Sequence, residues 1–251
     1  MAIDKRFTLE HPWVKGSQFE DLSAKEVLSR ILNHNQGNKI LFDLDGTLFD
    51  VSFRHRAILR AWAESHGGSF QEGKKIRRLL EEPLPYSIEE AFRIWGLEHS
   101  GEHQDHFESL YSFWEGHFFS GHYMEHDQPE EGAVEFLKTL EKEGLEVFYI
   151  SGRFNHCMRD GTVDQLKKHK FPFSDNEQLI LKSDFSIDDV EYKRRTALRL
   201  GDIRSTFDNE PANVSVMADT FPRDIHIFFE TVCSRREAEP KQKVIRMISF
   251  M

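Results

Sequence analysis

The sequence predicts an α/β protein, with a three-layer, Rossmann-like parallel sheet core and an inserted all-helical cap domain. From residue 39 onward, short apolar segments alternate with amphipathic segments of helical periodicity. Such alternation is typical of right-handed crossover units, which produce a parallel sheet with helices on both faces. One long interval of helical pattern interrupts the alternation, and this interval predicts the insert.

The expected strands are short and apolar, and turn or helix signals follow each of them. We expect strands at residues 39–45, 145–153, 178–182, 203–208 and 225–230, and helices at 134–144, 158–169, 188–201 and 211–221. Residues 186–189, Ser-Ile-Asp-Asp, fit a capping box before the third helix, and Gly201 and Gly144 are expected to end two helices. An amphipathic segment at 19–35 predicts a leading helix on the core.

Residues 51–129 break this alternation and contain no convincing strand. Four aromatic residues there recur on one helical face and are expected to form the core of the insert: Phe107, Tyr111, Trp114 and Phe118. Helices are expected near residues 53–66, 71–82, 87–96 and 103–120. The chain is therefore expected to divide into an α/β core, residues 1–50 and 130–251, and a helical cap, residues 51–129.

The composition limits the classes of partner. Lys and Arg number 33 and Asp and Glu number 43, which gives a net charge of −10 and predicts no general attraction to nucleic acid or to an anionic membrane surface. No segment approaches the ~18 apolar residues of a membrane span, and the first residues do not resemble a signal peptide. We therefore expect a cytoplasmic protein in which Cys157 and Cys233 are free thiols. The sequence does not specify an oligomeric state.

Polar side chains follow four of the predicted strands at the point where each strand ends. Asp43 and Asp45 follow the first, and Ser151, Lys182 and Asp208 follow three later ones. Because ligands of parallel α/β sheets bind beyond the carboxyl ends of the strands, we expect these groups to converge. Two carboxylates at i and i+2 of a strand repel each other, so the arrangement predicts a metal ion, a proton or both between them.

These residue types fit phosphoryl transfer assisted by Mg²⁺. Asp43, a backbone carbonyl at Asp45 and Asp208 supply the oxygen ligands that Mg²⁺ prefers. Two short loops, Gly46 with Thr47 and Ser151 with Gly152, are expected to hold phosphoryl oxygens. Lys193 is expected to steady Asp43 and the charge of the transferred group.

The two carboxylates of the first motif can then divide the chemistry. We expect Asp43 to attack phosphorus as a nucleophile while Asp45 protonates the leaving oxygen. Asp45 would next deprotonate the water that cleaves the aspartyl phosphate. Two easier steps thereby replace one difficult hydrolysis.

Four segments carry a resemblance to a known family. They are DLDGT at 43–47, YISGR with Ser151, EYKRR with Lys193, and FDNEPANV with Asp208. In this order they resemble the motifs of the haloacid dehalogenase-like (HAD) superfamily. The resemblance covers residues 39 to about 230 and implies a hydrolase with a helical cap inserted after the first motif, which would close over the site and select a small phosphorylated metabolite.

Some assignments stay open at this stage. Asp208 is followed by Asn209, Glu210 and Asn213 rather than by a second Asp, so Asn209 or Glu210 could share the metal. Lys182 competes with Lys193 for the role of the lysine. Asp50 and Arg54, at the cap entrance, could contact substrate, belong to a solvated hinge or form a local ion pair.

Other functions are also considered. A phosphomutase needs the same residues, and the motifs also resemble those of polynucleotide 3′-phosphatases, although the negative charge disfavours nucleic acid. A binding protein on the same fold would not need the nucleophile and the acid together, and dehalogenation would need neither Asp45 nor Asp208. Histidines of the insert could bind a metal or contact substrate, but solvated surface is favoured for them: His99, His103, His106, His117, His122 and His126.

Overall fold

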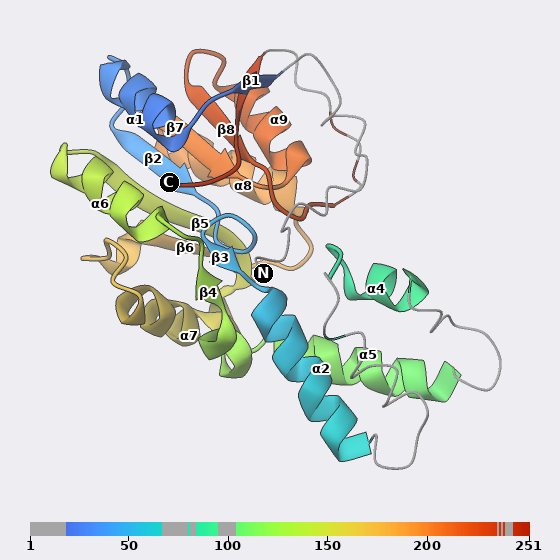
Figure 1. The fold of residues 1–251 in the computed structure, drawn as a ribbon. Helices are drawn as coiled ribbons and strands as arrows, with labels where there is room; N and C mark the ends of the chain where they lie inside the picture. Colours follow the sequence, from blue (N-terminus) through green and yellow to red (C-terminus); the bar gives the residue numbers. More distant parts are fainter. Residues whose placement is uncertain are drawn as a thin grey trace.

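Seven parallel strands form the central sheet, in the order β1-β9-β8-β7-β2-β5-β6 (Figure 1). The computed structural model describes residues 19–66, 80, 84–94, 104–234, 236, 238 and 243–251. The strands of the sheet are β1 (Phe19–Asp21), β2 (Lys39–Phe42), β5 (Glu146–Phe154), β6 (Leu179–Lys182), β7 (Ile203–Asp208), β8 (Ile225–Phe229) and β9 (Val244–Met247). The α/β fold expected from the sequence is confirmed.

Helices cover both faces of this sheet. The helices are α1 (Ala24–Asn33), α6 (Ala133–Lys142), α7 (Asn155–Lys168), α8 (Asp189–Leu200) and α9 (Pro211–Thr220). The first three pack on one face and the last two on the other, because alternate residues of each strand point to opposite faces. Ile40 and Phe42 of β2 thus join the cluster with α6, whereas Leu41 joins the cluster with α8 and α9.

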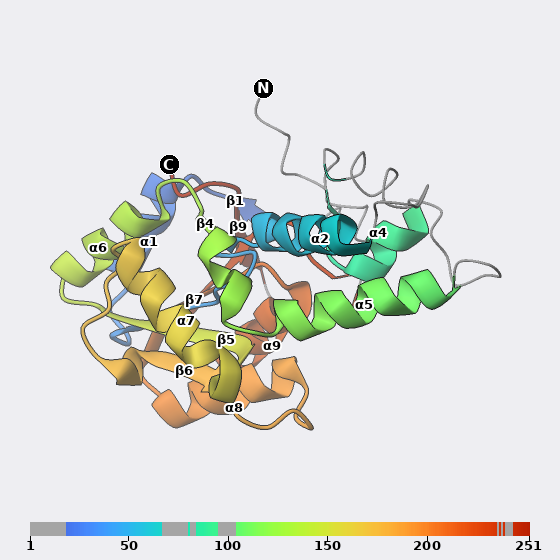
Figure 2. The same cartoon turned by 90° about the horizontal axis from the view of Figure 1, so that it is seen from below.

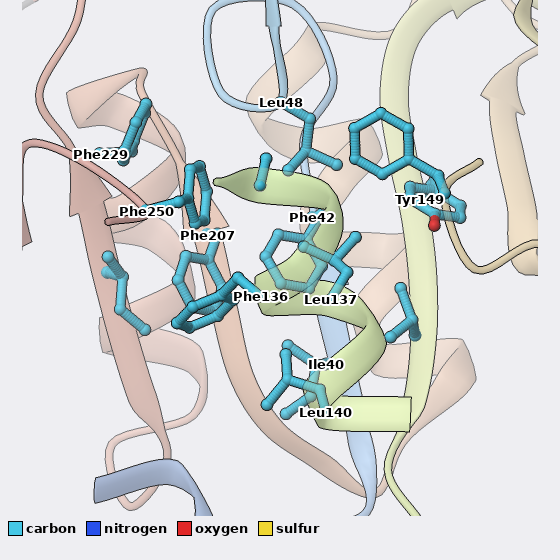
Figure 3. Close-up of a cluster of buried hydrophobic side chains, with 14 of the residues drawn as sticks. Ile40, Phe42, Leu48, Phe136, Leu137, Leu140, Tyr149, Phe207, Phe229 and Phe250 are labelled. Atoms are coloured by element: carbon cyan, nitrogen blue, oxygen red, sulfur yellow. The ribbon is translucent and has the colours of Figure 1, made fainter. Parts of the chain in front are cut away.

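The larger cluster lies between α6 and the middle of the sheet (Figure 3). Phe42 stacks on Phe207 of β7 with ring centroids 4.4 Å apart, and Phe136 of α6 contacts Phe207 and Phe250 edge-on. These aromatic contacts connect β2, β7, α6 and the C-terminal segment on one face of the sheet. Since β2 is buried on both faces and hydrogen-bonded on both edges, the residues that follow it start from a fixed position.

The helical insert begins and ends at a small two-stranded sheet. In it β3 (Phe49–Asp50) pairs with β4 (Gln128–Pro129) in antiparallel fashion. Between them lie α2 (Ser52–His66), α4 (Ile88–Ile94), α5 (Gln104–Phe118) and the 3₁₀ helix η2 (His122–His126). Figure 2 shows α2, α4 and α5 grouped to one side of the α/β core.

The insert has a hydrophobic cluster of its own. Trp62 of α2, Phe92 of α4 and Leu110 and Trp114 of α5 are buried together, with Phe107, Tyr111 and Phe118 packed against them. This agrees with the core expected from the aromatic spacing. The helix expected at 71–82 lies outside the described residues, apart from residue 80.

Several local features differ from the sequence-based expectation. The strands β1, β3, β4 and β9 were not predicted, because they have two to four residues each and lack a clear alternation. The N-cap of α8 is Asp188, whose side chain accepts a hydrogen bond from the backbone N–H of Val190, so the proposed capping box with Ser186 at its start is wrong. Ser186 instead donates to Asp184. Gly201 ends α8 as expected.

Cys157 and Cys233 are free thiols, as expected. Within the described ranges, no helix combines the length and the apolar character needed to cross a membrane.

Candidate active site

The loop after β2 places two carboxylates at the carboxyl edge of the sheet. The backbone N–H of Gly46 donates to the carbonyl of Phe49 at 2.8 Å, and the N–H of Thr47 donates to the carbonyl of Leu44 at 3.3 Å. Gly46 has a φ of +79°, and a Cβ there would lie 2.2 Å from the amide nitrogen of Asn209. A glycine is therefore required at the point where the chain turns between Asp45 and Thr47.

A buried lysine joins the first carboxylate to the last motif. Lys193 Nζ on α8 lies 2.7 Å from Asp43 Oδ1 and 2.7 Å from Asp208 Oδ2. All three side chains are at least nine-tenths buried. Residues that are 150 positions apart in the sequence thus form one ionic cluster at the ends of β2 and β7.

The charges of this cluster do not balance. Burial raises the pKa of Asp43 to about 7, Lys193 opposes the rise and the charge of Asp208 adds to it. Two carboxylates against one ammonium leave one negative charge in a buried site. Because an uncompensated buried charge is costly, this centre favours a further cation.

The polar residues around Asp208 already have hydrogen-bond partners. Asp208 Oδ1 accepts hydrogen bonds from the backbone N–H of Glu210 and from the amide of Asn213. The carboxylate of Glu210 accepts from the hydroxyl and the backbone N–H of Ser234, and Asn209 donates to the carbonyl of Val232. Glu210 and Asn209 are thus already engaged with other partners.

A divalent cation fits the oxygen atoms that remain. Asn213 Oδ1 is buried without a hydrogen-bond partner, on a side chain that touches Asp208. The donor set of Asp43, Asp208 and a nearby amide oxygen is all oxygen, as hard cations such as Mg²⁺ require. No group of three His, Cys, Asp or Glu residues with metal-ligand geometry occurs in the described residues. Mg²⁺ sites with few protein carboxylates are usual, since this ion retains waters and binds substrate phosphate.

The second carboxylate, Asp45, belongs to a different ionic cluster. Asp45 Oδ1 accepts from Arg153 Nη2 at 2.5 Å and Nε at 3.0 Å, and from Arg54 Nη2 at 3.1 Å. Both arginines also pair with Asp127, which is fully buried, as is Arg54. Two guanidinium groups and two carboxylates therefore form a neutral cluster, defined here as the Arg54–Arg153 cluster.

This cluster keeps Asp45 ionised. Burial acts against the charge, but the guanidinium groups of Arg153 and Arg54 hold the pKa of Asp45 well below its usual range. Arg54 follows β3 in the sequence and Asp127 precedes β4, so the cluster also connects Asp45 to both strands at which the insert begins and ends. Of the alternatives left open for Arg54, the structure contains the local ion pair.

The second motif lines the same cavity. Ser151 is buried at the carboxyl end of β5 and its hydroxyl oxygen accepts from the backbone N–H of Arg153 at 3.2 Å. Gly152 lies where a Cβ would meet a carboxylate oxygen of Asp189 at 3.0 Å. Lys182 pairs with Asp189 at 2.5 Å and not with Asp43, which favours Lys193 over Lys182 for the lysine role.

Two of the expected phosphate-binding groups have other partners. Thr47 is fully buried, and its hydroxyl donates to the side-chain oxygen of Asn209 and accepts from the backbone N–H of Asn209. Its backbone N–H and that of Gly46 both close the loop. Thr47 does not line the cavity, so its expected contact with a phosphoryl oxygen is not made in this arrangement. Gly46 does line the cavity.

The cavity lies between the core and the insert and has a volume of about 1030 Å³. Asp43, Asp45, Ser151, Lys193 and Asp208 all line it. On the insert side, His55 of α2 lies in a stack with Phe118 and Trp114, and the indole Nε1–H of Trp114 donates to His55 Nδ1 at 2.9 Å. Burial, with the charge of Arg54, lowers the pKa of His55 to about 3.

Tyr86, in the loop before α4, also reaches this centre. Its hydroxyl is hydrogen-bonded with Glu210, and burial together with the charge of Glu210 raises its pKa. Arg153, Asp127 and Tyr86 were not identified from the sequence. The SGR segment contained a signal for Arg153, because an arginine at the end of a buried strand requires a carboxylate partner.

The histidines of the insert do not form a metal site in the described part of the chain. His99 and His103 lie outside the described residues, as does the side chain of His106. His117 bonds to the carbonyl of Phe113, and His122 and His126 are exposed.

Residues 99–202 match the family model described as HAD superfamily, subfamily IIIB (Acid phosphatase). The match spans less than half of the chain and excludes residues 43–47 and Asp208. No curated protein sequence shows significant similarity to the chain.

Solved structures share the fold at low sequence identity. A phosphatase candidate from Clostridium difficile has a TM-score of 0.52 and 11% identity, over 86% of this chain and 95% of its own. A haloacid dehalogenase-like family hydrolase from Streptococcus pneumoniae has 0.50 and 13%, over 83% and 93%. Protein tyrosine kinase A of Mycobacterium tuberculosis has 0.51 and 15%, over 85% and 94%. At these identities the similarity is one of fold.

The fold and the site define an α/β protein whose parallel sheet gathers two carboxylates and a lysine at its carboxyl edge, next to a helical insert. The chain is similar to the haloacid dehalogenase-like superfamily of hydrolases, in its fold and in the match of residues 99–202. Enzymes of this superfamily generally use a divalent metal ion.

Proposed function

We propose that the protein is a Mg²⁺-dependent phosphatase that hydrolyses a small phosphorylated metabolite through an aspartyl-phosphate intermediate. The contact of Lys193 with both Asp43 and Asp208 carries the proposal, because it joins the end of β2 to the end of β7 at the floor of the cavity. The substrate class agrees with the cytoplasmic location expected from the sequence. Phosphoryl transfer needs mainly positioned groups and positive charge, and this centre supplies both.

The metal proposal rests on charge and on donor type. The centre has one excess negative charge before a phosphate enters, and Asp43, Asp208 and the backbone carbonyl of Asp45 offer oxygen ligands. When bound, Mg²⁺ would neutralise charge on the phosphoryl oxygens and stabilise the ionised form of Asp43. Asn213, with its unpartnered buried oxygen, would assist Asp208 in place of Asn209 or Glu210.

The chain's own residues then have distinct roles. In the first step an oxygen of Asp43 forms a bond to phosphorus, the bond from phosphorus to the leaving oxygen breaks, and that oxygen takes a proton from Asp45. In the second step Asp45 takes a proton from water, whose oxygen attacks phosphorus and displaces Asp43. Ser151, Gly152 and Gly46 are proposed to hold the phosphoryl oxygens, and Lys193 to stabilise their charge.

The Arg54–Arg153 cluster sets a condition on the role of Asp45. A carboxylate that accepts from two guanidinium groups is a poor proton donor. We therefore propose that Asp45 leaves one or both arginines before it protonates the leaving oxygen. Because Arg54 lies on α2, a movement of the insert would change this contact.

Residues 51–129 are proposed to act as a cap, and residues 1–50 and 130–251 as the core that carries the chemistry. The boundaries coincide with β3 and β4, and the cavity lies between the two parts. A cap in this position excludes water during the first step and contacts the leaving group.

Hydrolysis of a generic aryl phosphate tests the proposal. Wild type should turn over with Mg²⁺ and stop in excess chelator, and Asp43→Asn should have no activity under either condition. Asp160→Asn, which changes an exposed carboxylate on α7, is the matched control and should retain wild-type rates. Rapid acid quenching followed by mass spectrometry should detect phosphate on a peptide that contains Asp43.

Two results would contradict the proposal. The first is turnover that persists in Asp43→Asn, since that change removes the proposed nucleophile. The second is a folded wild type that neither hydrolyses any phosphomonoester with Mg²⁺ nor binds a beryllium fluoride phosphoryl mimic.

A further inference from the structure

We infer that the substrate of this site is a phosphomonoester whose leaving group is uncharged and carries an aromatic ring. The inference rests on the proposed function and concerns the part of the cavity beyond Asp43. Three observations carry it: where the exposed aromatic side chains lie, how the histidine of the insert is fixed, and how the cations of the cavity are paired.

The exposed aromatic side chains all face this cavity. In the described part of the chain, the large apolar side chains with high exposure are Phe53, Tyr86, Phe119, Phe185, Leu198, Ile248 and Met251. The four aromatic ones line the cavity and the three aliphatic ones do not. Exposed apolar side chains are ordinarily scattered, so the concentration of rings at one opening indicates a ligand surface.

These rings come from both sides of the opening. Phe53 lies on α2, Tyr86 precedes α4 and Phe119 follows α5, whereas Phe185 follows β6 of the core. Phe154 connects the two sides, with ring centroids 4.0 Å from Phe185 and 5.4 Å from Phe119. A flat ring that leaves the phosphoryl site would therefore meet aromatic faces from the core and from the insert together.

Deeper on the insert side, His55 offers one hydrogen-bond donor without charge. The indole nitrogen of Trp114 can only donate, so His55 Nδ1 accepts and the ring proton is on Nε2. The same ring stacks against both Phe118 and Trp114, which also stack on each other. This wall therefore matches a neutral group with an acceptor atom better than it matches an anion.

The cations of the cavity are already engaged. In the described residues that line it, Lys193 pairs with Asp43 and Asp208, Arg153 with Asp45 and Asp127, Lys182 with Asp189, and Arg236 with Asp188. Arg56 donates to the carbonyl of Leu80. A second phosphate or a carboxylate on the leaving group would have to compete with these partners and would face their carboxylates, which disfavours a charged leaving group.

The size of the cavity agrees with this class. Ligand pockets of about 300–1,000 Å³ hold drug-sized molecules, and this cavity has a volume of about 1030 Å³. A single small phosphate ester of an aliphatic alcohol would leave most of the aromatic wall without contact.

The test compares three probes on the Mg²⁺-loaded full chain: 2-naphthyl phosphate, glycerol 1-phosphate and fructose 1,6-bisphosphate. We expect kcat/KM for the naphthyl ester to exceed the other two by at least about tenfold, which is the effect of about one good ring contact. Equal values, or a preference for the bisphosphate, would overturn the inference.

Variants locate the effect in the aromatic wall. Phe185→Ala, at an exposed position that does not threaten folding, should lower kcat/KM for the naphthyl ester by roughly tenfold through KM. Its effect on the glycerol ester should be below about twofold. Ile248→Ala, an exposed apolar residue outside the cavity, is the control and should change neither value.

The two levels of proposal fail in different ways. Hydrolysis of all three probes without any ring preference would overturn this inference and leave the phosphatase proposal in place. Absence of any Mg²⁺-dependent hydrolysis, with Asp43→Asn indistinguishable from wild type, would overturn the proposed function itself.

Discussion

Arg153 holds Asp45 through two nitrogen atoms that donate to the same carboxylate oxygen, at 2.5 and 3.0 Å. Arg153 is itself fixed, because its other terminal nitrogen donates to Thr162 and Gln165 of α7. Arg153 thus connects Asp45, the second carboxylate of the DLDGT segment, to α7. The position of Asp45 depends on α7 as well as on its own loop.

Asp127→Asn should destabilise the protein strongly. The change leaves the guanidinium groups of Arg54 and Arg153 with one carboxylate in place of two, inside a buried cluster. Breaking a buried ion pair from one side costs about 3–5 kcal/mol, and urea unfolding measures the loss.

The exposed ion pair between Glu20 and Arg30 provides the control. Glu20→Gln should change the free energy of unfolding by less than about 1 kcal/mol. A similar small change in Asp127→Asn would show that the cluster does not contribute to stability in solution.

Lys193→Met should lower kcat far more than Lys182→Met. Lys193 contacts Asp43 and Asp208, whereas Lys182 contacts Asp189 at the rim. Removal of a charged group that stabilises a transition state costs about 10²–10³ in kcat, and we expect less than about tenfold for Lys182→Met. Initial rates at saturating substrate measure both, with circular dichroism as the check on folding. Equal losses would exclude a special role for Lys193.

Gly46→Ala should unfold the protein or remove its activity. The positive φ at this position disfavours any Cβ, and the atom that a Cβ would meet belongs to Asn209, which is fixed by its bond to Val232. Gly144 has a φ of +83° and nothing within 4 Å of its ideal Cβ. Gly144→Ala should therefore cost only about 1 kcal/mol, the backbone part of the effect. Comparable melting temperatures for the two variants would contradict this account.

Stability should fall as the pH drops below about 6.5. His226 is buried between Thr206 and the carbonyl of Phe221, and burial lowers its pKa to about 4. The unfolded chain binds a proton to this histidine at a higher pH than the folded chain does. This contribution is therefore fully present above the unfolded pKa and is lost as the pH falls from about 6.5 to about 4, by at most roughly 3 kcal/mol.

Urea unfolding at a series of pH values measures this slope. His226→Gln should flatten it between these limits, and His126→Gln, at an exposed position, should leave it unchanged. Burial of His55 acts with the same sign, so some slope should persist in His226→Gln. An unchanged slope in His226→Gln would assign the effect to other groups.

Much of the α/β core can be predicted from the sequence because burial on two faces produces continuous apolar strands. The segment that ends in Asp43 is of this kind, and its neighbour β5 contains a similar apolar run. By contrast, β3 has two residues and is defined only by its partner β4, which lies almost 80 residues later. No local pattern can indicate such a pair.

The contacts of the candidate site also divide into those that the sequence predicts and those that it does not. Lys193 lies on α8 and Asp208 ends β7, both of which are recognisable in the sequence, so their contact with Asp43 is expected from the topology of a parallel sheet. The partners of Asp45 do not, since Arg54 and Asp127 belong to the insert and their contact depends on how the insert is placed. The partner of Thr47 could not be predicted for a related reason: Asn209 lies 162 positions away.

The central place of β2 in the sheet also determines when the active site can form during synthesis. β2 ends at residue 42, yet its two neighbours are β5, from residue 146, and β7, from residue 203. A nascent chain that has only reached α7 holds Asp43 without Lys193 or Asp208. Contacts of such long sequence separation form late, because loop closure must come first. Asp43, the proposed nucleophile, thus leaves the ribosome well before Lys193 and Asp208, and the centre that the three residues form can assemble only after β7 has been made.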